Sequence, residues 1–311
     1  MSNYLSHFGL HESPFARNQH PKWIYLSPQN KEDLLKIRWT LGEYGGLALL
    51  RAGVGHGKST LIEYMMGGWS KYLGWKCAKL QNTGSISSPR ALLAETMSAF
   101  GLPTASTTRK MVTELETWLL EQSIANQPIV LFIDEAQSIG AGTLPVIRDL
   151  LNLQTQERIL LQIVLAGQLE LDAKLKGFPA LRSRIATSMT LEPLSLKEAD
   201  AMLLHRFTVA GAAEPYKICS GSASRLLFEM SQGIPRDFIT IADAAMKEAF
   251  LRGAHQIVDA HVVSAVHGLA GRQDSLTPYI SEVTKLRTSM PVDGRAFDAP
   301  FSAAGHVGKA A

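Results

Sequence analysis

The sequence predicts an α/β domain with a parallel sheet flanked by helices, followed by a smaller all-α domain. The apolar run "GGLALL" leads into "RAGVGHGKSTLIEYMM", Arg51 to Met66, a pattern typical of a strand, a glycine loop and a helix. A second apolar run, within "PIVLFIDEAQSI" from Pro128 to Ile139, is typical of a buried parallel strand that ends in two acids. After Ser195 the apolar residues keep helical spacing, which predicts the all-α domain.

Composition limits the class of protein. The chain has 311 residues, 46% of them hydrophobic, and a net charge of +3, which is compatible with contact to a polyanion without requiring it. No apolar run is long enough to span a bilayer, and "MSNYLSHFGLHESPF" lacks the layout of a signal peptide, so we expect a cytoplasmic protein. Cys77 and Cys219 lack metal-ligand spacing and are expected to be ordinary buried thiols.

The glycine loop carries the chemistry of a phosphate cradle. Backbone N–H groups can hold phosphates only where side chains stay away, which explains Gly53, Gly55 and Gly57. Lys58 supplies a cation for the β- and γ-phosphates, and Ser59 supplies a hydroxyl for Mg²⁺. A plain turn would explain the glycines but not the Lys-Ser pair. The nucleotide-binding residues predicted in this loop are Gly53, Val54, Gly55, His56, Gly57, Lys58, Ser59 and Thr60.

The glycine loop departs from the usual motif at one position. Its usual first glycine is Ala52 here, which is tolerable unless the position needs a positive φ.

The acids Asp134 and Glu135 form the second motif. They follow a predicted strand, and α/β sheets bind ligands at the carboxyl ends of their strands. Asp134 would hold Mg²⁺ with Ser59, and Glu135 would polarise the attacking water as general base. A capping pair is the alternative for the acids, but with the phosphate loop the sequence predicts binding of ATP and Mg²⁺.

Further polar residues follow along the chain. "RILLQIVLAGQ", Arg158 to Gln168, predicts a third strand with Gln168 at its tip, placed to orient the lytic water or sense the γ-phosphate. Arg182 and Arg184 precede another predicted strand and are candidates for an arginine finger toward a neighbouring subunit. Solvation at the surface is the alternative for each arginine.

The all-α domain begins with a predicted capping box, Ser195 with Glu198. "GIPR" places Pro235 in a first helical turn, with Arg236 able to contact phosphates. We expect the α/β domain over residues 1–195 with an N-terminal extension over 1–30, the helical lid over 196–270, and a flexible tail over 271–311.

In this order, these features resemble an AAA+ ATPase with its P-loop sheet and helical lid. "FGLHESPF", "WIYLSPQNKEDL", "LLNLQTQERILLQIVLAGQLEL" and "LRSRIATSMTLEPLSLKEA" resemble the branch of general secretion pathway protein A and the TnsC and TniB type ATPases of transposition modules, over residues 5 to 268. The resemblance implies ATP chemistry by Lys58, Ser59, Asp134 and Glu135. It further implies Arg182 or Arg184 as a finger acting in trans, Gln168 as sensor and Arg236 as lid sensor.

Two functions compete. In the first, ATP assembles the protein into a ring or helical filament on duplex DNA, which recruits or activates a transposase or target-selection protein. In the second, the ATPase couples energy to assembly of a secretion system. The secretion relatives carry a membrane span and a peptidoglycan-binding domain after the ATPase. Neither feature is recognised in this sequence, so we expect the DNA function here. A DNA-independent signalling or phage-encoded ATPase is a third possibility.

The DNA hypothesis points to the segments after the predicted second strand, "WKCAKLQN". Hydroxyl and cationic groups position a duplex without reading its sequence. "STTRKMVTEL" is equally typical of an exposed N-cap and first helical turn. The predicted phosphate contacts are Arg90, Thr107, Thr108, Arg109 and Lys110.

Overall fold

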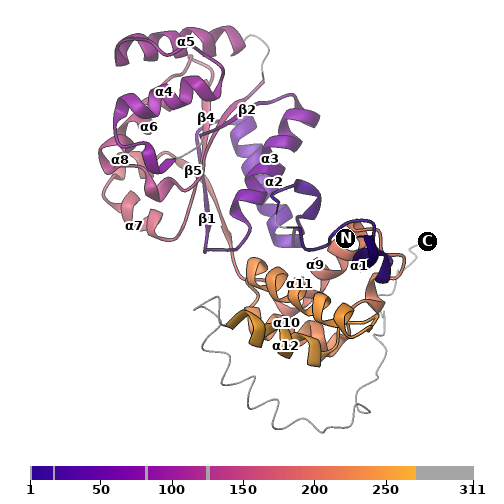
Figure 1. Cartoon of the computed structure of the whole chain (residues 1–311). Coiled ribbons are helices and arrows are strands. Elements are labelled where there is room, and N and C mark those ends of the chain that lie inside the picture. Colours follow the sequence, from indigo (N-terminus) through magenta and orange to yellow (C-terminus); the bar gives the residue numbers. More distant parts are fainter. Residues whose placement is uncertain (1, 17, 81–82, 124–126, 271–311) are drawn as a thin grey trace, which may run out of the picture. The chain divides into compact units, whose positions relative to one another are not determined.

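The computed structural model describes residues 2–16, 18–80, 83–123 and 127–270 (Figure 1). The chain divides into two compact units, one over residues 18–193 and one that joins residues 2–16 to the part from Leu194 onward. The tail predicted over 271–311 lies outside the described residues.

The first unit contains a five-stranded parallel sheet, which confirms the predicted fold class. Its strand order is β2-β3-β4-β1-β5, so that β4 lies between the strand with the phosphate loop and the strand with the acid pair. Every residue of β3 and β4 is buried, whereas the edge strands β2 and β5 also contain exposed and half-buried residues. The strands are β1 Leu47–Ala52, β2 Lys76–Leu80, β3 Ile129–Ile133, β4 Leu161–Gly167 and β5 Ile185–Leu191.

Helices cover both faces of this sheet (Figure 1). Because strand side chains alternate between faces, Leu131 packs into one core with α4 to α8, and Phe132 packs into the other with α2 and α3. The helices are α2 Pro28–Glu43, α3 Lys58–Leu73, α4 Pro89–Ala99, α5 Thr108–Ser123, α6 Leu144–Leu150, α7 Glu170–Lys176 and α8 Pro179–Arg182. Short 3-10 helices span Pro21–Trp23 (η1), Thr83–Ser85 (η2), Ala136–Ser138 (η3) and Ala141–Thr143 (η4).

The second unit is all helical, as predicted. Its helices are α1 Ser2–His7, α9 Leu196–Val209, α10 Gly221–Ser231, α11 Pro235–Leu251 and α12 Asp259–Ala270, with a 3-10 helix η5 at Pro215–Lys217. The capping box forms at the start of α9: the Ser195 hydroxyl accepts from the Glu198 amide, and the Glu198 carboxylate accepts from the Ser195 amide at 2.9 Å. Pro235 occupies the first turn of α11.

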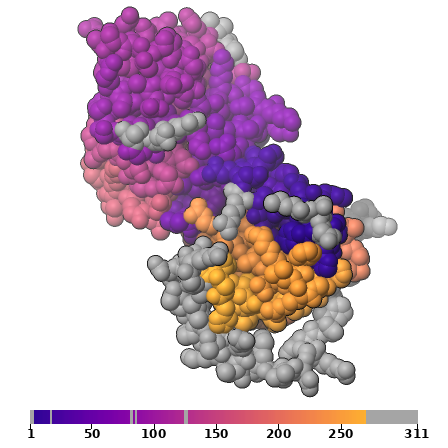
Figure 2. Space-filling view, viewed as in Figure 1, coloured from indigo at the N-terminus to yellow at the C-terminus, as the bar shows by residue number. Residues whose placement is uncertain are grey.

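The N-terminal segment belongs to this helical unit, which differs from the expected extension of the α/β domain (Figure 2). The Tyr4 ring meets Phe250 of α11 edge-on with centroids 5.4 Å apart. Arg206 of α9 donates from Nη1 to the Pro14 carbonyl at 2.8 Å. Because Phe8 is only 7% exposed, its apolar surface is removed from water by this packing. The boundary differs because tertiary packing, and not order along the chain, decides which core an apolar residue joins.

Both cysteines are free and half-buried. Burial is the main cause that raises the pKa of Cys77, to about 11, and burial likewise raises the pKa of Cys219. Within the described ranges, no cluster of three or more His, Cys, Asp and Glu side chains is placed to hold a metal ion. No helix among the described residues has the length and apolar character needed to cross a membrane.

A tight approach inside the helical unit yields a stability prediction. Gly233 has φ of 72°, and a Cβ there would lie 2.2 Å from the Leu194 carbonyl oxygen. Gly253 has φ of 69°, but a Cβ there would have no heavy atom within 4 Å. Gly253→Ala should therefore cost only the left-handed strain, about 1 kcal/mol, whereas Gly233→Ala should cost at least about twice as much because the backbone must also shift. Urea unfolding of both variants measures this difference, and equal losses would contradict it.

Candidate nucleotide-binding site

The phosphate loop connects β1 to α3. Gly55 and Gly57 have φ of 83° and 92°, a region that favours glycine. Ala52 is the last residue of β1 and is fully buried. Among the described non-glycine residues a positive φ occurs at Glu135 and Gln232, so Ala52 carries no such strain. The loop therefore tolerates alanine in place of the usual first glycine.

Lys58 and Ser59 contact the acid pair at the carboxyl-terminal ends of the strands. Lys58 begins α3, is only 7% exposed, and its Nζ contacts Glu135 Oε1 and lies 3.4 Å from Asp134 Oδ1. Ser59 Oγ donates to Asp134 Oδ2 at 2.8 Å. The structure thus brings together four of the residues that the sequence predicted for one site.

Three donors from the described residues hold the Glu135 carboxylate. Its Oε1 accepts from Lys58, and its Oε2 accepts from the side-chain amides of Gln137 and Gln168, the latter at 3.3 Å. Burial raises the pKa of Glu135, but the hydrogen bonds from these donors and the charge of Lys58 outweigh burial and leave this pKa below its ordinary value. The side chain is therefore an ionised carboxylate at neutral pH. Its backbone is left-handed, with φ of 50°, at the start of η3.

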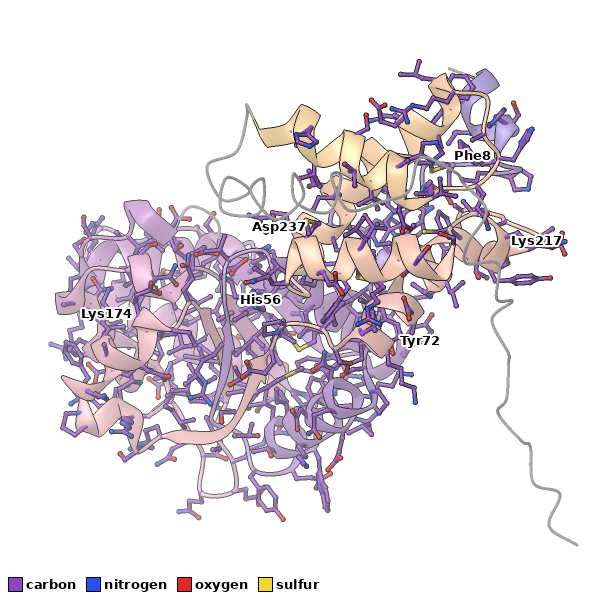
Figure 3. All side chains as sticks on the ribbon, turned by 90° about the horizontal axis from the view of Figure 1, so that it is seen from below. Phe8, His56, Tyr72, Lys174, Lys217 and Asp237 are labelled. Carbon is purple, nitrogen blue, oxygen red and sulfur yellow. The ribbon has the colours of Figure 1, made fainter. Side chains whose placement is uncertain are left out.

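Three further residues of the site were not predicted. Gln137 lies two residues after Glu135 and donates to its carboxylate. Lys174 on α7, which is labelled in Figure 3, donates to the carbonyls of Gln137, at 2.7 Å, and Ile139. Lys79 Nζ of β2 lies 2.9 Å from Glu63 Oε1 and 4.0 Å from Asp134 Oδ2. The polar end of "DEAQ" was a signal for Gln137, whereas only the strand pairing brings Lys79 toward Asp134.

These residues fit a magnesium nucleotide. The Ser59 hydroxyl and the Asp134 carboxylate supply the hard oxygen ligands that Mg²⁺ takes, and their oxygens already lie within hydrogen-bond distance. Lys58 is a buried cation at the start of a helix, where phosphate groups are stabilised. The glycine loop adds backbone N–H groups without side chains in their way.

Arg182 and Arg184 lie toward the amino-terminal ends of the strands, on the opposite side of the sheet from the phosphate loop. Arg184 immediately precedes β5, whose first residue Ile185 pairs with Leu47, the first residue of β1. The phosphate loop follows the opposite end of β1, so both arginines lie about a strand length from their own loop. Both are exposed, Arg182 at the end of α8 and Arg184 donating to Asn152 Oδ1 at 2.8 Å.

Arg236 is the second residue of α11 and is exposed. It belongs to the helical unit, and its contact with a nucleotide remains a prediction.

The predicted DNA contacts lie around the α4–α5 connection. Arg90 donates to the carbonyls of Ser106, at 2.7 Å, and Ala105, at 3.3 Å, so its guanidinium fastens this connection. The Thr107 hydroxyl accepts from the Lys110 amide at 3.3 Å, which is the N-cap geometry of the alternative interpretation. Thr108, Arg109 and Lys110 are exposed in the first turn of α5, with Lys110 3.7 Å from Glu114.

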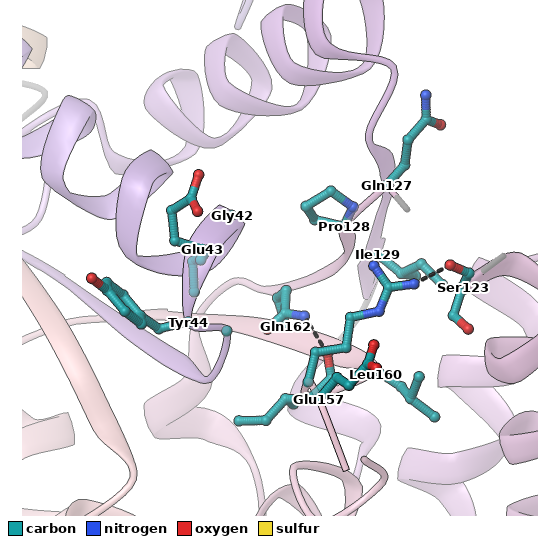
Figure 4. A pocket seen from close by; sticks show the side chains of 14 residues that line it. Gly42, Glu43, Tyr44, Ser123, Gln127, Pro128, Ile129, Glu157, Leu160 and Gln162 are labelled. Atoms are coloured by element: carbon teal, nitrogen blue, oxygen red, sulfur yellow. Dashed lines mark hydrogen bonds between the residues drawn. The ribbon is translucent and has the colours of Figure 1, made fainter. Parts of the chain in front are cut away.

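A separate hollow lies at the amino-terminal edge of the sheet (Figure 4). It is bordered by the end of α2 at Tyr44 and by Gln162 of β4. The Gln162 amide is satisfied locally, since its Oε1 accepts from the Gly46 amide at 2.8 Å and its Nε2 donates to the Ile159 carbonyl at 2.8 Å. This polar hollow is therefore distinct from the phosphate loop, which occupies the carboxyl-terminal edge.

Comparison with known sequences shows what this chain is similar to. Residues 41–175 match the family model described as AAA domain. The chain is similar to general secretion pathway protein A of Aeromonas hydrophila, with 35% identity over 279 residues that cover 88% of this chain and 50% of that protein. The chain thus spans half the length of this curated relative.

Solved structures share the fold at low identity. The ORC2 protein of Aeropyrum pernix, in its ADPNP-ADP complexes, matches with a TM-score of 0.62 and 18% identity, covering 84% of this chain and 72% of that one. Cdc6p of Pyrobaculum aerophilum gives 0.61 and 18%, covering 82% and 70%. The RuvB Holliday junction branch migration motor of Thermotoga maritima gives 0.55 and 17%, covering 86% and 79%. These structures share the parallel sheet with its flanking helices, and residues 41–175, which carry the phosphate loop and the acid pair, are similar to the AAA domain family.

Proposed function

We propose that this chain binds and hydrolyses Mg²⁺-ATP as an oligomeric molecular switch. The observation that carries this proposal is the meeting of Lys58, Ser59, Asp134, Glu135 and Gln168 at one edge of the sheet. A cation, a magnesium-type oxygen pair, a carboxylate base and an amide are the groups that phosphoryl transfer to water needs.

Each of these side chains has one role in the proposed mechanism. The glycine loop and Lys58 bind the β- and γ-phosphates, and Ser59 and Asp134 hold Mg²⁺, which neutralises charge on those phosphates when bound. Glu135 accepts the proton of the attacking water. Gln168 orients that water or contacts the γ-phosphate from the end of β4, and Arg236 would contribute from the lid.

The arginine positions favour a site shared between copies. Arg184 lies about a strand length from its own loop, at the opposite edge of the same sheet. In a head-to-tail ring or filament, the arginine edge of one copy faces the loop edge of the next, so Arg184 can stabilise charge on the neighbour's γ-phosphate. Arg182 is the second candidate for this role.

The partner that we propose is duplex DNA, with the oligomer acting as regulator or target adaptor for a transposase. Thr107, Thr108, Arg109 and Lys110 support this proposal because they form an exposed cationic helix start suited to sequence-independent phosphate contacts. Arg90 would act indirectly, through its hold on the carbonyls of the α4–α5 connection.

A secretion function is the second candidate. The observation that favours it is the 35% identity to general secretion pathway protein A of Aeromonas hydrophila. In that case the switch would drive assembly of envelope machinery, and ATP-dependent affinity for DNA would be absent.

Lys58→Ala should weaken ATP binding by at least about 10- to 100-fold, the loss expected for hydrogen bonds to a charged group. The substitution also leaves Asp134 and Glu135 without their cation, so that they repel the phosphates. Calorimetric titration with Mg²⁺-ATP measures the affinity. Lys71→Ala, at the last turn of the same helix, is the control and should bind normally. Equal affinity of the Lys58 variant and the wild type would remove the phosphate loop from nucleotide binding.

Arg184→Ala should bind ATP normally but lose turnover by about 10³-fold or more when an engaged finger is removed. Mixing Arg184→Ala with Lys58→Ala should restore activity, because some interfaces then place an intact loop beside an intact arginine. The ATPase rate of each variant and of their mixture, with DNA present, is the measurement. Normal turnover by Arg184→Ala alone would transfer the role to Arg182, which the Arg182→Ala variant tests directly.

Arg109→Ala/Lys110→Ala should bind duplex DNA more weakly in the presence of ATP, and the log–log slope of its salt dependence should fall by about 0.9 for each phosphate that is no longer neutralised. Fluorescence anisotropy over a series of salt concentrations measures both quantities. Lys217→Ala removes one positive charge from the exposed η5 turn of the helical unit, outside α5. It is the control for the general effect of losing a surface lysine. An unchanged affinity and slope would reject the assignment of Arg109 and Lys110 to DNA, and no DNA binding by the wild type would favour the secretion function.

A further inference from the structure

Among the described residues, the donors to the Glu135 carboxylate fill fewer acceptor sites than the group has. A carboxylate has about four lone-pair directions, two on each oxygen. Oε2 is filled by two amides, from Gln137 and Gln168, while Oε1 receives Lys58. With one described donor on Oε1 and two on Oε2, Oε1 is the oxygen with room for another hydrogen bond within the described part of the chain, and it lies next to the cation that is expected to meet the phosphates.

Gln137 contacts both Glu135, the proposed base, and Gln168, the proposed sensor that follows β4. Its Nε2 donates to Glu135 Oε2, and its Oε1 accepts from the Gln168 backbone amide at 3.1 Å. Both ends of the amide are thus used, and this fixes its orientation. Gln168 is thus linked to Glu135 directly through its side chain and also through Gln137.

The surroundings hold Gln137 in this place. Its own carbonyl accepts from Lys174 Nζ at 2.7 Å, which fastens η3 to α7. Gly167, the last residue of β4, leaves room for the amide and for Leu171, because a Cβ there would lie 2.9 Å from Gln137 Oε1 and 2.7 Å from Leu171 Cδ2. A merely solvated glutamine would have neither a backbone fastened from another helix nor a glycine opposite its amide.

We propose that Gln137 is a positioning residue for Glu135: it holds Oε2 together with Gln168, so that Oε1 is directed to the attacking water. This inference rests on the proposed ATP hydrolysis. Gln137 touches neither nucleotide nor water in this role and acts only through the carboxylate.

The test compares ATP turnover and ATP affinity in two variants. Gln137→Glu keeps the shape, removes the donor and adds a negative charge beside Glu135, whereas Gln137→Ala removes both hydrogen bonds without adding charge. Both should lower kcat by about 10- to 100-fold, the range expected when a catalytic group is misplaced, with KM and the calorimetric ATP affinity unchanged. Gln162→Ala is the structural control, since this buried amide of β4 bonds to backbone groups at the other edge. It should lower the melting temperature without the selective loss in kcat.

A double-mutant cycle separates positioning from stability. Glu135→Gln keeps the shape but cannot accept a proton, and should lower kcat by about 10² to 10⁴-fold with ATP still bound. If Gln137 acts through Glu135, adding Gln137→Ala to Glu135→Gln should lower the residual rate no further. Wild-type kcat in Gln137→Glu, or losses that add fully in the double variant, would overturn the positioning role alone. Absence of hydrolysis by the wild type would instead overturn the proposed function, and this inference with it.

Discussion

A buried lysine ammonium is the constraint around which the α/β unit is built. Lys58 is 7% exposed and Asp134 is 8% exposed, and a buried charge is tolerable only when it is paired and hydrogen-bonded. Lys58 starts the helix after β1, while its carboxylates follow β3, and these strands are separated by β4. The end of β4 therefore lies between the ends of β1 and β3, and Gln168, which follows β4, donates its side-chain amide to Glu135 beside the cation.

The same strand order separates the site from the arginines. In a parallel sheet all carboxyl ends share one edge, so the phosphate loop, the acid pair and Gln168 meet there. Arg184 precedes a strand instead of following one, and it consequently lies at the amino-terminal edge. A single copy cannot close this distance through its own sheet, which is the physical basis for proposing a site completed by another copy.

The helical unit gathers both ends of the described chain. Arg206 of α9 holds the Pro14 carbonyl, and Tyr4 packs on Phe250 of α11. Burial is the largest cause that lowers the pKa of Arg206, to about 10, yet at neutral pH the guanidinium remains charged. Breaking the hydrogen bond from this buried guanidinium to the Pro14 carbonyl would leave a charged donor without that partner, which costs more free energy than the bond contributes when it is formed. The N-terminal segment is therefore a structural part of this unit.

The sequence by itself determined the local elements and the chemistry of the loop. Its apolar runs located the strands around Leu47, Ile129 and Leu161, and the capping box located the start of α9 at Ser195. These features depend on neighbours within a few residues, so periodicity and capping patterns are sufficient to predict them. The Lys-Ser pair and the acid pair were predictable for the same reason.

Only the tertiary structure decided which side chains share one carboxylate and which unit takes the N-terminus. Lys174 joined the site because strand β4 brings α7 against η3, a contact between segments more than thirty residues apart, and the same strand brings the Gln168 amide to Gln137. Arg90 turned out to fasten a connection whose carbonyls, at Ala105 and Ser106, no local pattern marks as its partners. Phe8 packs with the helical unit for the same physical reason: apolar burial is non-directional, and the chain's folded path, not its order, decides what surface is within reach.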